Sequence, residues 1–461
     1  MTVRSRRIFI PMYLLGCCAL LTLLWLPGTR YPIVSDTINY ALLGRSLWEH
    51  GTYALFGVPH AKYLFLYSFV SYLFTALLGL QWGMHILSLV SGFAALTVTF
   101  LLIRRTFSPI VAAGTVLAAA LHPTFILLST VGSSDLFFAF LFFASAYAYL
   151  LAGERRGYYL LSGILLGLAC LTRYNGLPLF VVFVAYTLWK RRADLRDPWF
   201  IAGMLGGAGI FALWLVRNTL VFGNPFFSEY TVELTANAPH HLRQILSNLV
   251  YYGNPVHNVF PFFFPFALYG LWRHAREQNF LLLIALAGFA LAAIWWVQAI
   301  RFALPSFIVL LAFAVWGILD LLSHFPRSSF LLAVSLSGAF LVVQGLSLCL
   351  YTYGACNAAF DRTFGLVPRN MGLSSEGFFA WDEARNFLNA NAPAGANVLV
   401  FDEFDAVAWR EGVFRPDLRV TTDRSLCPLF SISQRNDEGS VLYQTPDAPV
   451  TYVMEKECAG E

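Results

Sequence analysis

Apolar runs long enough to cross a bilayer recur along most of this chain, and they constrain its fold more than any other feature. A helix needs about 20 apolar residues to span the hydrocarbon core. The chain has 461 residues, of which 58% are hydrophobic and only 12% are charged. A soluble globule with an ordinary surface cannot be built from this composition. The sequence therefore predicts a polytopic all-α membrane protein.

The spans are located by apolar runs with basic residues at their ends, because Arg and Lys concentrate on the cytoplasmic side. About 11 spans are expected when an N-terminal anchor is included. They cover residues 8–26, 83–103, 109–128, 135–152, 158–172, 176–189, 199–216, 259–272, 280–298, 302–322 and 330–353. This arrangement puts the basic clusters in the cytoplasm and places four ionisable residues on the outer face: Asp36, Asp135, Arg217 and Arg301.

A further apolar segment, residues 63–80, breaks the alternation. A full crossing there would move Arg104 and Arg105 to the outer face. We therefore expect a re-entrant or partly buried helix on the outer side, which must pack against protein.

The N-terminus combines Arg4, Arg6 and Arg7 with an apolar run, as a secretory signal does. Residues 14–17 also resemble a lipoprotein cleavage box. The apolar run continues past Cys17, where a lipoprotein turns polar, so we expect a retained anchor. The basic cluster then holds the N-terminus in the cytoplasm.

Residues 31–67 form the predicted first outer loop. The loop is too polar to cross lipid, and it is rich in Trp, Tyr and Phe, which favour the membrane–water boundary. It contains one acid near the first span, Asp36, followed later by His60, Lys62 and Tyr63. Local chemistry leaves two interpretations open: a site where a polar group meets a lipid, or an interfacial loop with ordinary anchors.

The C-terminal part, residues 357–461, regains charged and turn-forming residues and predicts a small extracytoplasmic α/β or α+β domain. Residues 381–391 have helical spacing, and residues 397–401 and 450–454 favour strands. Cys356, Cys427 and Cys458 would lie in an oxidising space. A Cys427–Cys458 bridge and three unpaired cysteines are both open. The other four cysteines fall in or beside spans and are expected to pack: Cys17, Cys18, Cys170 and Cys349.

Three more groups of ionisable residues lie at the ends of apolar runs. Asp135, at the head of a span, suits a helix N-cap. Arg173 divides two short apolar runs, where it either snorkels or binds an anion. Arg217 and Arg301 are each ordinary interface anchors alone, but several arginines on the same face as an exposed acid indicate a phosphate site.

The chain resembles the GT-C membrane glycosyltransferases that take sugars from polyprenyl phosphates, especially the bacterial family 39 or 83 type. These are relatives of protein O-mannosyltransferases and aminoarabinose transferases. The resemblance covers roughly residues 8–353, as a domain of residues 1–356. Its motifs are the Asp-containing outer loop, GLACLTRYNGL, WLVRN with FGNP, and RFALP. The loop departs from the family pattern, which often has Asp-Glu, because Thr37 follows Asp36.

This resemblance implies a GT-C architecture and an inverting transfer of a sugar from a polyprenyl-phosphate donor to an acceptor hydroxyl or amine. Asp36 matches the family's catalytic acid position and is expected to be the general base. Asp135 and Tyr40 would orient the acceptor or the site. The donor phosphate, as leaving group, requires cationic stabilisation. The residues expected to bind it are Lys62, Arg173, Arg217 and Arg301, and more weakly His60 and Tyr63.

The expected location is a bacterial inner membrane, and the expected partners are the lipid-linked donor, membrane lipid and an acceptor glycan, lipid or protein. No cofactor is expected, no spacing indicates a dedicated metal site, and no basic run indicates nucleic acid. Two alternatives remain: a polyprenyl-lipid flippase or secondary transporter without transferase activity, and an inactive binding scaffold.

Overall fold

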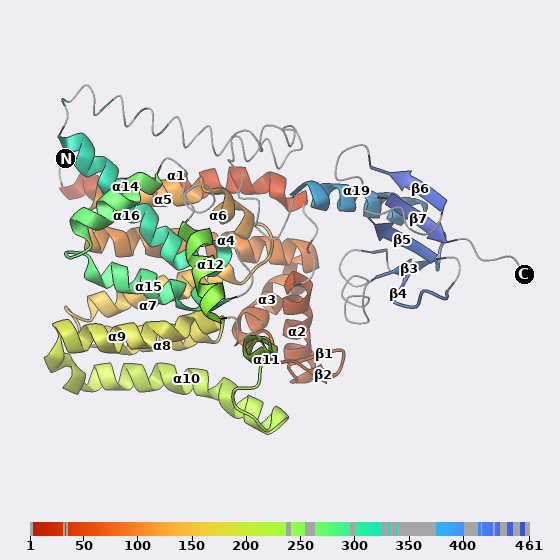
Figure 1. Cartoon of the computed structure of the whole chain (residues 1–461), viewed down its shortest axis with the longest axis horizontal. Coiled ribbons are helices and arrows are strands. Elements are labelled where there is room, and N and C mark those ends of the chain that lie inside the picture. The colour runs from red at the N-terminus through yellow and green to blue at the C-terminus, as the bar shows by residue number, and fades with distance from the viewer. Residues whose placement is uncertain are drawn as a thin grey trace, which may run out of the picture.

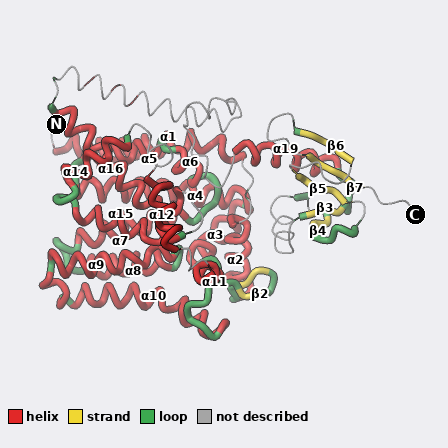
Figure 2. The backbone as a smooth tube through the Cα atoms, in the orientation of Figure 1, coloured by secondary structure: helices red, strands yellow, loops and turns green. Residues whose placement is uncertain are grey.

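The computed structural model describes residues 3–30, 33, 36–236, 241–253, 263–295, 300–324, 326, 331, 335, 338, 375–400, 414–415, 417–426, 429–433, 440–445 and 452–456. A body of packed helices makes up most of it, and a small sheet follows near the C-terminus (Figure 2). The predicted last span, residues 330–353, lies almost wholly outside the described residues. So do the predicted domain boundary near residue 356 and Cys349, Cys356, Cys427 and Cys458.

The helices agree closely with the apolar runs (Figure 1). The principal ones are α1 (Val3–Trp25), α2 (Asp36–His50), α3 (Phe65–Leu78), α4 (Leu80–Thr106), α5 (Pro109–Ala120), α6 (Pro123–Leu128), α7 (Asp135–Leu151), α8 (Tyr158–Cys170), α9 (Leu177–Lys190), α10 (Pro198–Phe222), α11 (Glu229–Ala236), α12 (His241–Gly253), α14 (Phe264–His274), α15 (Asn279–Ile294) and α16 (Leu304–Ser323). Short 3₁₀ segments lie between them: η1 (Leu26–Arg30), η2 (Tyr174–Gly176), η3 (Arg192–Arg196) and η5 (Ile300–Ala303). Among the described residues, three helices are long and apolar enough to cross a membrane: Leu80–Thr106, Pro198–Phe222 and Ile300–Ser323.

The predicted span over residues 109–128 is two helices, α5 and α6, because Pro123 interrupts it. Proline has no N–H to continue the ladder, and it disfavours helical geometry in the preceding residue. His122 is accordingly extended (φ −77°, ψ 130°), and its Nδ1 accepts the Thr124 N–H at 3.2 Å as a cap for α6.

The polar stretch between the predicted spans 199–216 and 259–272 is in part helical. α10 continues to Phe222 and ends at Gly223, which adopts the left-handed conformation (φ 71°) that glycine favours. Arg217 therefore lies in the last turns of a helix instead of in a loop. α11 and α12 follow, and neither was predicted from the sequence.

α3 is the helix that breaks the alternation of spans. It has 14 residues, a length of about 21 Å, which is shorter than the hydrocarbon core. It packs closely on α2: a Cβ at Gly44 would lie 2.2 Å from the Ser68 carbonyl oxygen. This close packing on α2 agrees with the expectation that the helix lies against protein. Whether α3 crosses the membrane stays a prediction, since α8 and α9 are no longer than α3.

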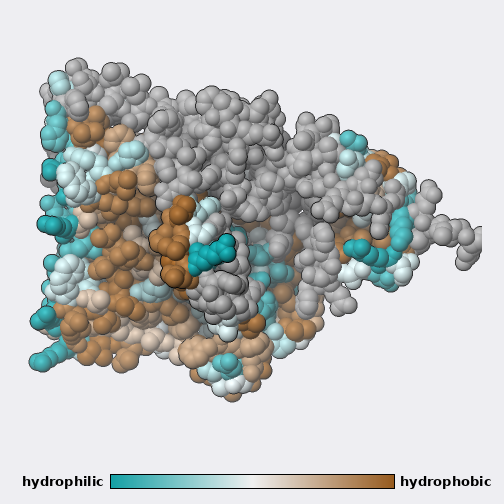
Figure 3. All heavy atoms as spheres, viewed as in Figure 1, coloured by the Kyte–Doolittle hydropathy of each residue, from teal (hydrophilic) through white to brown (hydrophobic). Residues whose placement is uncertain are grey.

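The two ends of the helical body differ in chemistry. At one end, α4 meets the α7–α8 turn through an ion pair between Arg105 and Glu154, and Arg156 pairs with Asp194 at 2.5 Å. Figure 3 shows hydrophilic side chains along this left edge, beside a largely hydrophobic face. The opposite end holds the start of α2, the start of α7 and the η5 segment. The candidate site residues lie at this second end.

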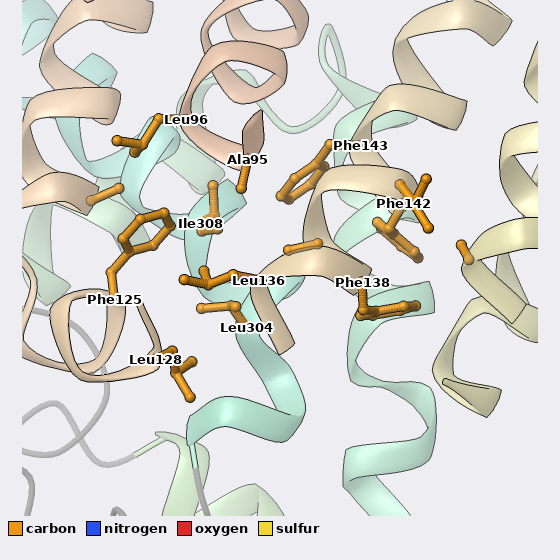
Figure 4. Close-up of a cluster of buried hydrophobic side chains, with 14 of the residues drawn as sticks. Ala95, Leu96, Phe125, Leu128, Leu136, Phe138, Phe142, Phe143, Leu304 and Ile308 are labelled. Carbon is orange, nitrogen blue, oxygen red and sulfur yellow. The ribbon is translucent and has the colours of Figure 1, made fainter. Parts of the chain in front are cut away.

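A continuous apolar core fixes the helix ends in place. Leu136 and Phe138 of α7 are buried at 0% and 3% exposure, as are Leu304 and Ile308 of α16 at 1% each. Figure 4 shows these side chains gathered with Phe125 of α6 in one cluster. This core therefore holds α6, α7 and α16 against one another next to the end of the body where the site residues lie.

The C-terminal sheet has five strands in the order β4-β3-β5-β7-β6. Its strands are β3 (Asn397–Leu399), β4 (Arg419–Thr421), β5 (Leu429–Ser433), β6 (Ser440–Gln444) and β7 (Tyr452–Lys456). β3 is parallel to β4 and β5, and β7 is antiparallel to β5 and β6. Helix α19 (Ser375–Asn391) contributes Ala384 and Leu388 to a separate apolar core under the sheet. The predicted helix and both predicted strands are thus present, in a mixed sheet.

Candidate active site

Asp36 is the first residue of α2, and its half-buried carboxylate faces Tyr63. The Tyr63 hydroxyl donates a hydrogen bond of 2.5 Å to Asp36 Oδ1. Tyr63 itself is 5% exposed, and its ring lies 4.8 Å from that of Tyr40. A short hairpin, β1 (Ala54–Leu55) with β2 (Val58–Pro59), turns the chain so that Tyr63 comes back to the start of α2.

Asp135 begins α7 and forms an ion pair with Arg173, whose Nη1 lies 3.0 Å from Asp135 Oδ1. The same nitrogen donates to Ser134 Oγ at 3.0 Å, and the Tyr40 hydroxyl lies 3.1 Å from that oxygen. Asp135 is 2% exposed, and its carboxylate accepts no hydrogen bond from a described residue. It does not cap α7 through a hydrogen bond. Arg173 is thus the charge that compensates a buried acid, and Ser134 connects this pair to Tyr40.

Arg301 lies in η5, and its guanidinium group packs near the same aromatic ring, that of Phe302, as the guanidinium group of Arg173 does. The two guanidinium carbons are 5.0 Å and 5.7 Å from the centroid of the Phe302 ring. Asn175 Nδ2 donates to the Phe302 carbonyl oxygen at 3.2 Å and so joins η2 to η5. Within the described part of the chain, Arg301 forms no ion pair, and its buried Nε donates no hydrogen bond. A positive charge without a carboxylate partner at this position is suited to an anionic ligand.

A second group of cations surrounds His60. Lys62 Nζ lies 3.9 Å from Glu229 Oε2 and 5.8 Å from the centroid of the Tyr230 ring. His60 Nε2 accepts the backbone N–H of Tyr63 at 3.2 Å. Burial, followed by the charges of Lys62 and Arg217, lowers the pKa of His60 to about 4. His60 is therefore neutral near pH 7, where it can hold the loop but cannot supply positive charge.

Arg217 is held by aromatic rings and backbone oxygen instead of by an acid. Its Nη2 donates to the Tyr53 carbonyl and its Nη1 to Asn218 Oδ1, both at 3.0 Å. The guanidinium carbon lies 5.0 Å from the ring centroids of both Trp214 and Phe222. Arg217 forms no ion pair with any residue in the described ranges, so its charge is also available to an anion.

Tyr230 of α11 lies between these two groups and was not predicted from the sequence. Burial raises the pKa of its hydroxyl, and the ionisable groups that act on it are Tyr40, Arg173, Asp36 and Arg301. Its ring lies 5.0 Å from that of Trp295. No sequence pattern distinguished this tyrosine, because it lies in the polar stretch where no element was expected. Phe302 was also missed, although it is part of the RFALP motif.

The structure brings the predicted site residues to one end of the helical body. Hydrogen bonds, an ion pair and ring contacts connect five of them, directly or through Ser134: Asp36, Tyr40, Tyr63, Asp135 and Arg173. Arg301 joins them through Phe302, and His60, Lys62 and Arg217 form the adjacent group. Their functional roles remain predictions. Among the described residues, no three His, Cys, Asp or Glu side chains come together as a metal site would require.

His60 provides a pH-dependent test of this loop geometry. Between its folded pKa of about 4 and its unfolded value of about 6.5, the unfolded chain binds more protons than the folded chain. Stability therefore falls as the pH falls through this window. We expect His60→Gln to lose less thermal stability than wild type between about pH 7.5 and about pH 5. Thermal unfolding in detergent measures this, with the exposed His50→Gln as control. A loss equal to that of wild type would contradict the neutral, buried state of His60.

The comparisons with known proteins agree with this architecture. The family model described as dolichyl-phosphate-mannose-protein mannosyltransferase matches residues 60–216. That segment contains Lys62, Asp135 and Arg173. The structure of ArnT from Cupriavidus metallidurans bound to undecaprenyl phosphate is similar with a TM-score of 0.59 and 16% identity, over 96% of this chain and 98% of that one. The apo form of the same protein gives a TM-score of 0.58 and 15% identity, with 98% of each chain covered.

A more distant structural match is the oligosaccharyltransferase of Archaeoglobus fulgidus tethered to an acceptor peptide. It has a TM-score of 0.50 and 13% identity, and the match covers 86% of this chain and 63% of that one. No curated protein sequence matches the chain. Together these findings confirm the predicted resemblance to GT-C membrane glycosyltransferases, and the fold is the GT-C fold seen in ArnT.

Proposed function

We propose that the protein is an inverting glycosyltransferase that moves a sugar from a polyprenyl-phosphate donor to an acceptor hydroxyl or amine. The observation that carries this proposal is the position of Asp36 at the same end of the helical body as two arginines that pair with no described carboxylate, Arg217 and Arg301. An acid beside cations that lack anionic partners suits a base that works next to a bound phosphate. The similar structure of ArnT from Cupriavidus metallidurans is bound to a lipid phosphate, undecaprenyl phosphate.

In this mechanism the Asp36 carboxylate accepts the proton of the acceptor hydroxyl as its oxygen attacks the anomeric carbon of the sugar. The bond between that carbon and the phosphate oxygen breaks at the same time. One displacement inverts the anomeric centre. The leaving polyprenyl phosphate keeps the bonding electrons, and the cations Arg173, Arg301, Lys62 and Arg217 stabilise the negative charge that develops on it.

The buried pair of Asp135 and Arg173 has a positioning role in this proposal. The ion pair fixes the Arg173 guanidinium, which donates a hydrogen bond to Ser134 Oγ. The same oxygen is hydrogen-bonded to the Tyr40 hydroxyl, and the Tyr40 ring packs on Tyr63. Asp135 would thus orient the site through Arg173 without touching the reacting atoms. We further propose that this end of the body faces the periplasm of a bacterial inner membrane. The N-terminus would then be cytoplasmic and the C-terminal domain extracytoplasmic.

The direct test is release of polyprenyl phosphate. Purified protein in detergent is given a polyprenyl-phospho-sugar and a mixture of cell-envelope glycans, lipids and proteins as acceptors. Chromatography then separates the intact donor from the released polyprenyl phosphate. A transferase releases polyprenyl phosphate and adds sugar to an acceptor. A flippase or transporter leaves the donor intact but moves it across a proteoliposome membrane, which would overturn the proposal.

Arg301→Ala is expected to raise the donor KM by about tenfold or more, because it removes a charge-assisted contact with the phosphate. The matched control is Arg104→Ala. Arg104 is an exposed arginine in the last turn of α4, at the opposite end of the helical body. Steady-state kinetics over a series of donor concentrations measures the effect. Equal KM values for Arg301→Ala and wild type would show that Arg301 is an interface anchor.

A further inference from the structure

The Tyr63 hydroxyl is hydrogen-bonded to one of the two carboxylate oxygens of Asp36, the atoms that an acceptor hydroxyl has to approach. A general base accepts a proton across a heavy-atom distance of about 2.6–3.2 Å. The Tyr63 oxygen lies 2.5 Å from Asp36 Oδ1, and the Tyr63 O–H donates a hydrogen bond to that oxygen. Tyr63 thus presents to the base the same group, an O–H donor, that the acceptor or a water molecule would present.

Three contacts hold the Tyr63 ring in this position. It stacks on the His60 ring at 5.0 Å with an interplanar angle of 29°, and it packs on Tyr40 at 4.8 Å. The backbone N–H of Tyr63 is bound by His60 Nε2 at 3.2 Å. With 5% of its surface exposed, Tyr63 is part of the packed loop. The packing of the loop therefore holds the Tyr63 hydroxyl against Asp36, whereas an exposed side chain could rotate away.

Tyr63 is suited to cover the base without reacting. Burial, together with the neighbouring Asp36 charge, raises the pKa of the Tyr63 hydroxyl far above its ordinary value. The phenol keeps its proton and stays a hydrogen-bond donor. A phenol that is stacked on His60 and packed against Tyr40 is also unable to advance toward a sugar carbon as a mobile acceptor can.

We propose that Tyr63 is a placeholder for the acceptor hydroxyl: it keeps water off Asp36 until the acceptor displaces it. This inference rests on the proposed function. The reaction it suppresses is hydrolysis of the donor, in which a water oxygen bonds to the anomeric carbon and the carbon–oxygen bond to phosphate breaks. Asp36 takes the water proton, and the products are free sugar and polyprenyl phosphate.

The test compares hydrolysis with transfer in Tyr63→Phe, which removes the hydroxyl and keeps the ring. Without acceptor, we expect release of free sugar to rise about tenfold, because a hydrogen bond to a charged group is worth at least that factor. With acceptor, the acceptor KM is expected to fall because no phenol has to be displaced. Tyr63→Leu is a second variant with the same expected rise in hydrolysis. It covers the case in which one replacement alone impairs folding, as judged by thermal unfolding.

Tyr72→Phe is the matched control, since Tyr72 lies on α3 and donates at 3.1 Å to Glu49 of α2, away from the site. It is expected to leave both reactions unchanged. If Tyr63 only positioned Asp36, the Tyr63 variants would lose transfer turnover without any rise in hydrolysis, and the inference would be wrong. Unchanged hydrolysis and acceptor KM would also overturn it. If the wild-type protein releases no polyprenyl phosphate at all, that result would instead contradict the proposed function itself.

Discussion

Asp36→Asn is expected to lower transferase turnover by about two to four orders of magnitude, the usual contribution of a general base. Asparagine keeps the shape of the side chain, and its Oδ1 still accepts the Tyr63 hydroxyl, so the loop is expected to stay folded. The loss should therefore appear in kcat and leave the donor KM nearly unchanged. Polyprenyl phosphate release by purified protein measures both quantities.

The control for this variant is Glu49→Gln, which neutralises an exposed acid on the same helix. Its turnover is expected to equal that of wild type. Elution of all three proteins as a single species in detergent establishes that they are folded. An Asp36→Asn protein with more than about a tenth of wild-type turnover would exclude Asp36 as the general base, because even a modest one contributes about a hundredfold.

Arg173→Ala is expected to destabilise the protein by about 3–5 kcal/mol and to abolish turnover. The substitution leaves the carboxylate of Asp135, which is 2% exposed, without its compensating charge. Breaking a buried ion pair by removing one partner carries a cost of this size. A large drop in the midpoint of thermal unfolding in detergent would show it.

Two further variants separate stability from activity. Arg105→Ala breaks an exposed pair, with side-chain exposures of 46% and 55%, and is expected to change stability by about 0–1 kcal/mol. Arg173→Met combined with Asp135→Leu removes both charges and should recover most of the lost stability. It should not recover turnover, because the site then lacks the cation at Ser134. Full activity in the double variant would show that this pair serves folding only.

The helical body could be predicted well from the sequence because each apolar run must form its own backbone hydrogen bonds in lipid. The runs at residues 83–103, 135–152 and 158–172 agree with α4, α7 and α8 to within a few residues. The sequence did not predict the break at residues 109–128, because hydropathy stays high across Pro123 and the segment forms two helices. The sequence also did not predict α11 and α12 in the polar stretch after residue 216, because hydropathy does not detect helices that are polar.

The candidate site was predicted in part. The sequence singled out Asp36 as the acid of the outer loop and Arg173 as a costly charge between two short apolar runs. Arg301 alone was an ordinary anchor and indicated a phosphate site only together with other arginines on the same face. The sequence favoured a helix cap for Asp135, since Ser-Ser-Asp before an apolar run is typical of one. The structure shows instead that Asp135 forms a buried pair with Arg173, and no pattern within one segment contains that partner.

What the sequence alone determined is the class of protein, the positions of most helices and the set of unusual charges at their ends. These are local properties, since each depends on about one helix length of residues and on the solvent around it. Only the tertiary structure decided which of these charges meet. Asp36 with Tyr63, Asp135 with Arg173, and Arg173 with Arg301 across the Phe302 ring join segments far apart in the chain. Such contacts depend on how the helices pack against one another, and that packing is a property of the whole core instead of any single run.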